Sequence, residues 1–332
     1  MIRYALHRLA VAALQVVIIT FVAYALFFLI ADLTGANPAQ RVAGKGASPA
    51  RVREVAHVMG TDRPYYEQYA RFLWRLAHGN LGYSFQRRQP VAQIVLPAAG
   101  VTASLVIGAA VIWLFIGIGV GLVGALKPRS AADRMLTVAV QTAIAAPVFW
   151  IAPMIAYLLA YQPTQGQLLG IPLGRRVNWL PIQGYVGPLA NPVEWAHHLI
   201  LPWIALAIGF AALYARFVRA FVIEQLAEDY VKTARAKGAS ERRIIRHHVS
   251  ALVAPAIVVL LGLDVGVALG GALFVETVFG LPGLGYVGLS SIQNLDYALT
   301  VGTITFAAIV AVVAIAIADL VQAYLDPRVR VV

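Results

Sequence analysis

The sequence predicts an all-α integral membrane protein with six transmembrane helices and a small helical domain in one outer loop. Two observations lead to this fold class. Hydrophobic residues make up 60% of the 332-residue chain and charged residues only 12%, whereas about a quarter of the residues in a soluble domain are charged. In addition, residues 9–31 carry no formal charge, and a run of this length crosses a hydrocarbon layer about 30 Å thick at about 1.5 Å per residue.

The first apolar run is expected to stay in the chain as a transmembrane helix. Arg3 and Arg8 precede it, as basic residues precede the apolar part of a signal peptide. That apolar part is only about 7–15 residues long, and this run is much longer. The predicted organisation is a first helix within 1–31, an outer helical domain at 32–97 and a five-helix core at 98–332. The six predicted spans are 9–31, 98–126, 135–161, 199–223, 252–275 and 301–325.

The basic residues predict that both termini lie in the cytoplasm. The net charge is +11, but Lys and Arg lie between apolar runs, which favours contact with membrane lipid over nucleic-acid binding. With the N-terminus inside, the cytoplasmic segments hold 15 Lys and Arg residues, counting Arg216 and Arg219 at the end of the fourth span. The short outer segments hold 2. The loop 32–97 is left out of this comparison because loops longer than about 60 residues cross regardless of charge.

The two long outer loops are predicted to differ in structure. In the loop 32–97, Ser48 and Pro49 favour a helix start and Gly60 favours its end. The loop 162–198 contains five prolines and is predicted to be irregular. The residues that predict a second helix in the first loop are Asp62 and Pro64 at its start, Tyr65, Tyr66, Tyr69, Phe72, Leu73 and Leu76 along an apolar stripe, and Gly79 at its end.

Small residues recur at intervals of four in two spans. Gly117 and Gly121 lie in the second span, and Gly262, Gly266 and Gly270 lie in the fifth. This spacing leaves a smooth strip on one helix face, so that backbones can approach closely. Tight helix packing is the plainer interpretation. The sharper hypothesis is that the fifth helix lines a translocation pathway whose width changes.

Two acidic residues fall inside predicted spans. Asp319 lies close to the cytoplasmic end of its span and is expected to be structural. Asp264 lies about 18 Å into the fifth span by helical rise, near the bilayer centre, where a carboxylate costs at least about 2.5 kcal/mol. It either serves the translocation pathway or is a paired or protonated structural acid. A proton-coupled secondary transporter that uses Asp264 is the first rival function.

The cytoplasmic segment 224–250 predicts two short helices joined by a tight turn. Gly238 suits the left-handed position after the first helix, and Ser240 can cap the second. Such a projection can dock on a partner subunit and transmit a conformational change from it. The alternative interpretation is a basic loop that only sets membrane topology, but that role requires charge and no capped turn. The apolar faces are Ala227, Tyr230, Val231 and Ala234 in the first helix and Ile244, Ile245, Val249 and Leu252 in the second.

Residues 229–238, DYVKTARAKG, resemble the coupling loop of ABC importer permeases, in the branch that transports dipeptides and oligopeptides. The common form of this loop has glutamate and alanine where this chain has Lys232 and Thr233, and proline where it has Ala251. The resemblance implies that the loop couples the permease to an ATPase. It assigns this role to Glu228, Asp229, Tyr230, Thr233, Ala234, Arg235, Lys237 and Gly238.

Other segments along the chain resemble the same branch. The most distinctive is 276–285, ETVFGLPGLG, an outer loop signature formed by Glu276, Phe279, Pro282, Gly283 and Gly285. The remaining matches are 59–64, 68–69, 79–84, 146–150, 198–202 and 325–328.

The resemblance implies a type I importer permease of the bacterial plasma membrane that is itself non-catalytic. Its expected partners are a homologous second permease, two ATP-binding cassette ATPases and an extracytoplasmic substrate-binding protein or lipoprotein. ATP and Mg²⁺ would bind to the ATPases, and the motif G-x-x-x-x-G-K-[ST] is indeed missing from this chain. Peptides are the expected substrates, with haem or a nickel chelate as alternatives.

Metal and cofactor sites are not expected in this chain. It contains no cysteine, which excludes disulfides and thiolate ligands. The pairs His197-His198 and His247-His248 are poor ligand sets, because neighbouring residues on a helix project about 100° apart.

Overall fold

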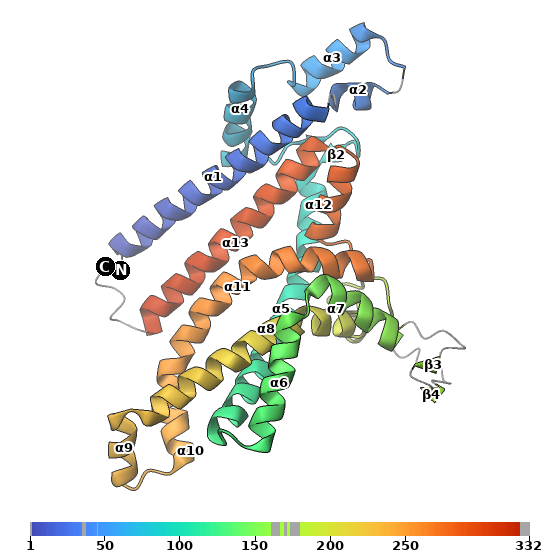
Figure 1. Ribbon diagram of the computed structural model, residues 1–332. Helices are drawn as coiled ribbons and strands as arrows, with labels where there is room; N and C mark the ends of the chain where they lie inside the picture. Colours follow the sequence, from blue (N-terminus) through green and yellow to red (C-terminus); the bar gives the residue numbers. More distant parts are fainter. Residues whose placement is uncertain are drawn as a thin grey trace. The chain divides into compact units, whose positions relative to one another are not determined.

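The computed structural model describes the chain as two compact units that are almost entirely helical (Figure 1). The first unit is Met1–Gly100 with Pro282–Ala316, and the second is Val101–Leu281 with Ile317–Val332. The described residues are 2–34, 38–44, 46–160, 167–168, 171–172 and 180–325.

The first unit holds the N-terminal helix, the outer loop domain and parts of two long helices that continue into the second unit. A core cluster joins the start of α5 to α12 and α13 through Val91, Val95, Leu284 and Leu299. The elements are α1 (Ile2–Thr34), α2 (Pro38–Ala43), α3 (Pro49–Met59), α4 (Tyr65–Ala77), the antiparallel pair β1 (Tyr83–Ser84) and β2 (Gln89–Pro90), α5 (Val91–Leu126) as far as Gly100, α12 (Leu284–Gln293) and α13 (Tyr297–Leu325) as far as Ala316.

The second unit holds most of the membrane helices and the projecting loop. Figure 1 shows α9 and α10 at the opposite end of α8 from α7. The elements are the rest of α5, α6 (Ala131–Ala145), α7 (Val148–Ile155), the π-helix η1 (Ala156–Ala160), the antiparallel pair β3 (Gln167–Leu168) and β4 (Ile171–Pro172), α8 (Pro192–Ala227), α9 (Asp229–Ala236), α10 (Glu241–Ile244), the π-helix η2 (Ile245–Val249), α11 (Ser250–Phe279) and the end of α13.

Five of the six predicted spans are single helices, and the third is broken. The described chain has five helices long and apolar enough to cross a membrane, at His7–Leu26, Val91–Leu126, Pro192–Ala227, Glu241–Phe279 and Tyr297–Tyr324. The third predicted span, 135–161, is bent, because α6 and the helix that follows it meet at an angle of 104°. Pro147 pushes Ala146 into an extended conformation (φ −86°, ψ 116°), which ends α6. The bent pair completes a set of six if it counts as one span.

The second outer loop is shorter than predicted. Residues 161–166, 169–170 and 173–179 lie outside the described residues, and 180–191 form turns and bends without regular structure. The fourth membrane helix already begins at Pro192 rather than near 199. Asn191 explains this early start, because its side chain accepts hydrogen bonds from the backbone N–H groups of Val193 and Glu194.

The first predicted helix of the outer domain is confirmed as α3. The Ser48 hydroxyl accepts a hydrogen bond from the Arg51 backbone N–H, Pro49 is the first helical residue, and Gly60 ends the helix in the left-handed conformation (φ 72°). The role predicted for Asp62 is wrong. Its carboxylate contacts His57 Nδ1 at 2.8 Å, and this contact lowers the pKa of Asp62.

Helix α4 packs on α1 by only part of its apolar stripe. Gln68 and Phe72 are buried, whereas Tyr66 is 74% exposed. The Tyr69 hydroxyl donates a hydrogen bond to the Val17 carbonyl at 2.9 Å and lies 3.1 Å from the Thr20 hydroxyl. The buried face therefore centres on Gln68, Tyr69 and Phe72, and it ties the outer domain to the first membrane helix.

Close packing of α5 on α8 explains the glycine pair in the second span. A Cβ atom at Gly117 would lie 2.5 Å from the Tyr214 Cβ atom, and one at Gly121 would lie 2.7 Å from the Ala215 carbonyl oxygen. Both distances are too short for any other residue, so the packing interpretation is confirmed here. Gly270 in α11 differs, because a Cβ atom there would meet nothing within 4 Å.

Candidate functional site: the loop between α8 and α11

The projecting loop begins with a break at Glu228. This residue adopts an extended conformation (ψ 153°) between α8 and α9, so the predicted continuous amphipathic helix is divided into two. Asp229 then lies in the first turn of α9, where a carboxylate interacts favourably with the helix dipole, and it accepts a hydrogen bond from Lys232 Nζ at 2.8 Å. Because of this break, the axis of α9 can point in a different direction from the axis of α8.

The turn after α9 has the geometry predicted for Gly238. The Gly238 N–H bonds to the Arg235 carbonyl at 2.9 Å, and the Ala239 N–H bonds to the Ala234 carbonyl at 3.0 Å. With φ of 81° at Gly238, these two bonds form a Schellman motif. Ser240 occupies the cap position of α10 as predicted, although its hydroxyl makes no capping bond.

A two-bond ion pair connects the helices on either side of the turn. Arg235 Nε and Nη2 donate to the two carboxylate oxygens of Glu241 at 2.6 and 3.1 Å. The neighbouring carboxylate raises the pKa of Arg235, so its guanidinium stays charged. Bidentate contacts of this kind fix orientation as well as distance. The loop is therefore held in one conformation by its turn and by this pair.

The inner face of the loop packs on the ends of the membrane helices. Val231 and Ile244 are fully buried in a cluster with Val218 and Val222 of α8 and Ala125 of α5. Tyr230 and Ala234 join this cluster as predicted, whereas Ala227 is exposed. A displacement of the loop would therefore act directly on α5 and α8.

The π-helix η2 changes which residues of the second apolar face are buried. Ile244, Val249 and Val253 enter the cluster, whereas Leu252 is 48% exposed, contrary to prediction. An ordinary helix would repeat at three or four residues, but the π turn inserts one more between Ile244 and Val249. Every later side chain in α11 is rotated accordingly.

The outer face of the loop is polar and exposed. The structure brings the predicted coupling residues together and sorts them by side: Tyr230 and Ala234 lie inward, and the exposed members are Glu228, Asp229, Thr233, Arg235, Lys237 and Gly238. His247 and His248 are also exposed, and no cluster of metal-ligating side chains occurs in the described part of the chain. The arrangement suits a rigid docking surface rather than a chemical centre.

The residues predicted to line a pathway do not share one environment. Gly262 is buried, Gly266 is half-buried and Gly270 is exposed. Asp264 is half-buried and lies beside the Tyr214 hydroxyl of α8. Tyr214 is buried, and its hydroxyl forms no hydrogen bond of ordinary geometry with the described residues.

The predicted outer loop signature contains a buried acid at the end of α11. Glu276 is fully buried and accepts a hydrogen bond from the Thr102 hydroxyl at 2.6 Å. Phe279 is also buried, and Gly280 ends α11 in the left-handed conformation (φ 61°). The remaining signature residues belong to the first unit: Pro282 is exposed, Gly283 caps α12 and Gly285 is half-buried within it.

Two buried polar contacts were not predicted. Asp133, only 4% exposed, accepts hydrogen bonds from Arg219 Nε and Nη2 at 2.6 and 2.8 Å and so joins α6 to α8. In the first unit the Ser84 hydroxyl donates to the buried carboxylate of Asp296. The sequence offered one signal for the second contact, because Ser84 ends the segment 79–84 that resembles the importer branch.

Two family models together match nearly the whole chain. The model described as "Binding-protein-dependent transport system inner membrane component" matches residues 117–331, and the model of its N-terminal part matches residues 1–106. A putative peptide permease protein of Brucella ovis is 31% identical over 337 residues, covering 100% of both chains. The dipeptide transport system permease protein DppB of Escherichia coli K12 is 30% identical over 342 residues, covering 99% of both.

Proposed function

The chain belongs to the family of inner membrane components of binding-protein-dependent transport systems, and on this basis we propose that it is the permease subunit of an ATP-driven importer of peptides. The family is one of multi-pass transport proteins with the type I importer permease fold, in agreement with the membrane helices. The peptide substrate is supported by the names of full-length relatives that are peptide or dipeptide permeases. In this role the chain forms half of a translocation pathway together with a homologous second permease.

The observation that carries the proposal is the rigid, polar projection built from α9 and α10. Its outer face is exposed, its turn is fixed by Gly238 and by the Arg235–Glu241 pair, and its inner face packs on α5 and α8. A surface with these properties can dock on a cytoplasmic ATPase and transmit a conformational change of that ATPase to the membrane helices. ATP and Mg²⁺ bind to that partner, and this chain is non-catalytic. An extracytoplasmic binding protein or lipoprotein delivers the substrate.

The function is tested by reconstituting the chain with its partner subunits in vesicles and measuring peptide uptake. Uptake that requires ATP and the binding protein is the expected result. The first rival, a proton-coupled transporter, predicts instead that this chain alone accumulates peptide when a proton gradient is imposed. ATP-driven uptake of haem or a nickel chelate, with no uptake of any peptide, would keep the transporter class but replace the substrate.

Both termini are placed in the cytoplasm in this proposal. The distribution of basic residues in short connecting segments supports this orientation. It places the loop between α8 and α11 on the side where ATP is available, and it places the outer loop domain on the side of the binding protein.

Asp264 is proposed to contribute to the pathway on α11, together with Gly262, Gly266 and Gly270. Its half-buried carboxylate lies at membrane depth, a position where charged groups commonly serve transport. Asp264→Asn keeps the size of the side chain and removes its charge. We expect this variant to assemble normally and to take up cationic peptides more slowly relative to neutral ones. A loss of complex yield with every substrate alike would instead identify a structural acid.

A further inference from the structure

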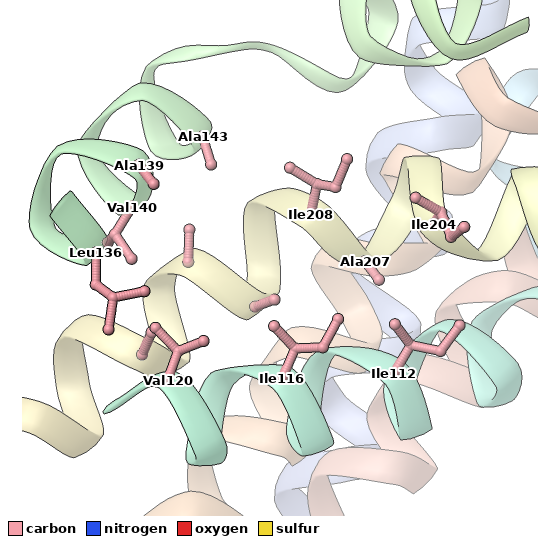
Figure 2. Close-up of a pocket in the computed structure, with 13 residues that line it drawn as sticks. Ile112, Ile116, Val120, Leu136, Ala139, Val140, Ala143, Ile204, Ala207 and Ile208 are labelled. Atoms are coloured by element: carbon pink, nitrogen blue, oxygen red, sulfur yellow. The ribbon is translucent and has the colours of Figure 1, made fainter. Parts of the chain in front are cut away.

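A groove in the second unit runs between α5, α6 and α8, and its walls are entirely aliphatic (Figure 2). The groove is open on one side and has a volume of about 240 Å³. Ile112, Ile116 and Val120 project into it from α5, and Leu136 and Val140 project from α6. Four alanines of α8 contribute to its lining, and their short side chains leave the space open. No polar side chain lines this part of the groove.

The groove continues at one end into a smaller polar cavity of about 110 Å³. The two share Val120, Leu136, Val140 and Ala215, so they form one continuous channel along α6. We call it the polar cavity because five of its eleven lining residues are polar or charged, whereas those of the groove are all aliphatic. The five polar or charged residues are Arg216, Arg219, Asp133, Thr137 and Gln141.

The charges in the polar cavity leave one cation free. Asp133 and Arg219 neutralise each other through two hydrogen bonds, and the second carboxylate oxygen also accepts the Arg129 backbone N–H at 2.8 Å. Arg216 is exposed, and its guanidinium forms no hydrogen bond or ion pair with any other residue that the structure describes. The cavity therefore presents an unpaired positive charge beside an aliphatic groove.

From this geometry we propose that the channel binds an anionic phospholipid, with an acyl chain in the aliphatic groove and the phosphate on Arg216. The α5 residues from Ile112 to Val120 cover about 12 Å of helix. This is most of one leaflet of a hydrocarbon core about 30 Å thick. The polar end of the channel adjoins the basic connection between α5 and α6, where a headgroup would lie.

The charge at one end of the groove favours an anionic lipid over a helix of another subunit. Arg216 forms no hydrogen bond or ion pair with another described residue, so a phosphate can serve as its partner. The six alanines of the lining would also admit a helix of another subunit, and that occupant is an outcome of the test below.

This lipid site goes beyond the proposed transport function and needs only the membrane location of the chain. The choice of leaflet rests on the proposed orientation, which puts Arg216 at the cytoplasmic surface, where anionic lipids attract basic residues. The test is carried out without ATP or substrate. The lipid site can therefore be refuted while the transport function holds, and the transport function can be refuted while the lipid site holds.

The experiment measures lipid retention by native mass spectrometry of the full chain in its assembled complex. The complex is supplied with either phosphatidylglycerol or phosphatidylcholine of identical acyl chains. We expect preferential retention of phosphatidylglycerol, and Arg216→Gln should weaken that retention about fivefold without changing the retention of phosphatidylcholine. Ala139→Phe, which fills the aliphatic groove, should lower retention of both lipids.

Two control variants and one cross-link decide the outcome. Arg134 is an exposed arginine of α6 that lines neither cavity, and Arg134→Gln should leave retention unchanged. Val138→Phe adds an aromatic ring on the same helix outside the groove and should also have no effect. Equal losses from Arg134→Gln and Arg216→Gln would show a diffuse surface charge and overturn the site. Cross-linking of a cysteine at position 139 to another subunit would overturn it as well, because the groove would then be a protein interface.

Discussion

At the scale of single residues, Gly238 is needed for its backbone conformation rather than for its small size. A Cβ atom at this position would meet nothing within 4 Å, but φ is 81°. Gly238→Val should therefore strain the turn by about 1–2 kcal/mol, and transport should fall although the chain still inserts in the membrane. Gly238→Asn is the matched control, because asparagine tolerates this conformation. Peptide uptake and ATP hydrolysis by the assembled importer are the measurements, and normal uptake by the valine variant would contradict the role of the turn.

The Asp133–Arg219 pair should contribute more to stability than the surface ion pairs of the chain. Asp133 has little exposed surface, so Asp133→Asn weakens its contact with the Arg219 guanidinium and should lower the thermal unfolding midpoint of the complex. Glu54→Gln removes an exposed partner of Arg51 and should cost less than about 1 kcal/mol. Thermal unfolding of the purified complex in detergent measures both.

A second variant separates the pair from its surroundings. Asp133→Asn combined with Arg219→Gln removes both charges, so it should recover part of the stability lost in the single variant. If the double variant is less stable than Asp133→Asn alone, the pair does not act as a unit.

For single residues, the sequence predicts which glycines adopt a left-handed backbone conformation better than it predicts which side chains form hydrogen bonds with each other. Gly60 and Gly238 could be predicted because a left-handed position after a helix favours glycine whatever surrounds it. The roles of Asp62, Asp133 and Glu276 could not, because the partner of each depends on how distant segments pack. Asp133 in particular lies beside Arg129 and Arg134 in sequence, whereas its partner Arg219 is 86 residues away.

At the scale of helices, the crossing of α5 on α8 should be sensitive to a single methyl group. A Cβ atom at Gly121 would lie 2.7 Å from the Ala215 carbonyl oxygen and 2.8 Å from the Val218 Cβ atom. Gly121→Ala should therefore force the helices apart and destabilise the chain by about 1–3 kcal/mol. A Cβ atom at Gly119, two residues away, would meet nothing within 4 Å, so Gly119→Ala is the matched control. The thermal unfolding midpoint of each variant is the measurement, and equal shifts in the two variants would show that the close approach is not limiting.

The sequence predicted the positions of the membrane helices well, because the length of an apolar run indicates a span. It predicted breaks and π turns within these helices less well, because these depend on local backbone geometry. Five spans could be located because long, predominantly apolar runs have few alternatives in a membrane protein. The break at Ala146–Pro147 divided the third span, because proline restricts the residue before it. This signal was present in the sequence, but the prediction followed the length of the apolar run. The π turn after Ile244 carries no comparable signal, so the shift of the buried face from Leu252 to Val253 could not be foreseen.

At the scale of the whole molecule, the proposed orientation can be tested on both sides of a single helix. Helix α8 contains 36 residues, which corresponds to about 54 Å and exceeds a hydrocarbon core of about 30 Å. Gln183 precedes this helix, Ser240 lies in the loop beyond its other end, and both are exposed. The two positions must therefore lie on opposite sides of the membrane if α8 crosses it.

We expect a cysteine at position 183 to react with a membrane-impermeant maleimide added to intact cells, and a cysteine at position 240 to react only after the membrane is opened. The natural chain contains no cysteine, so each signal comes from one site. A cysteine at the exposed position 51 of the outer domain should behave like the one at 183. Labelling at 240 from outside would place the Gly238 turn away from any cytoplasmic ATPase, and the proposed coupling would then be impossible. Labelling at 183 and 240 from the same side would instead mean that α8 does not cross the membrane, and this would contradict its assignment as a span while leaving the turn geometry intact.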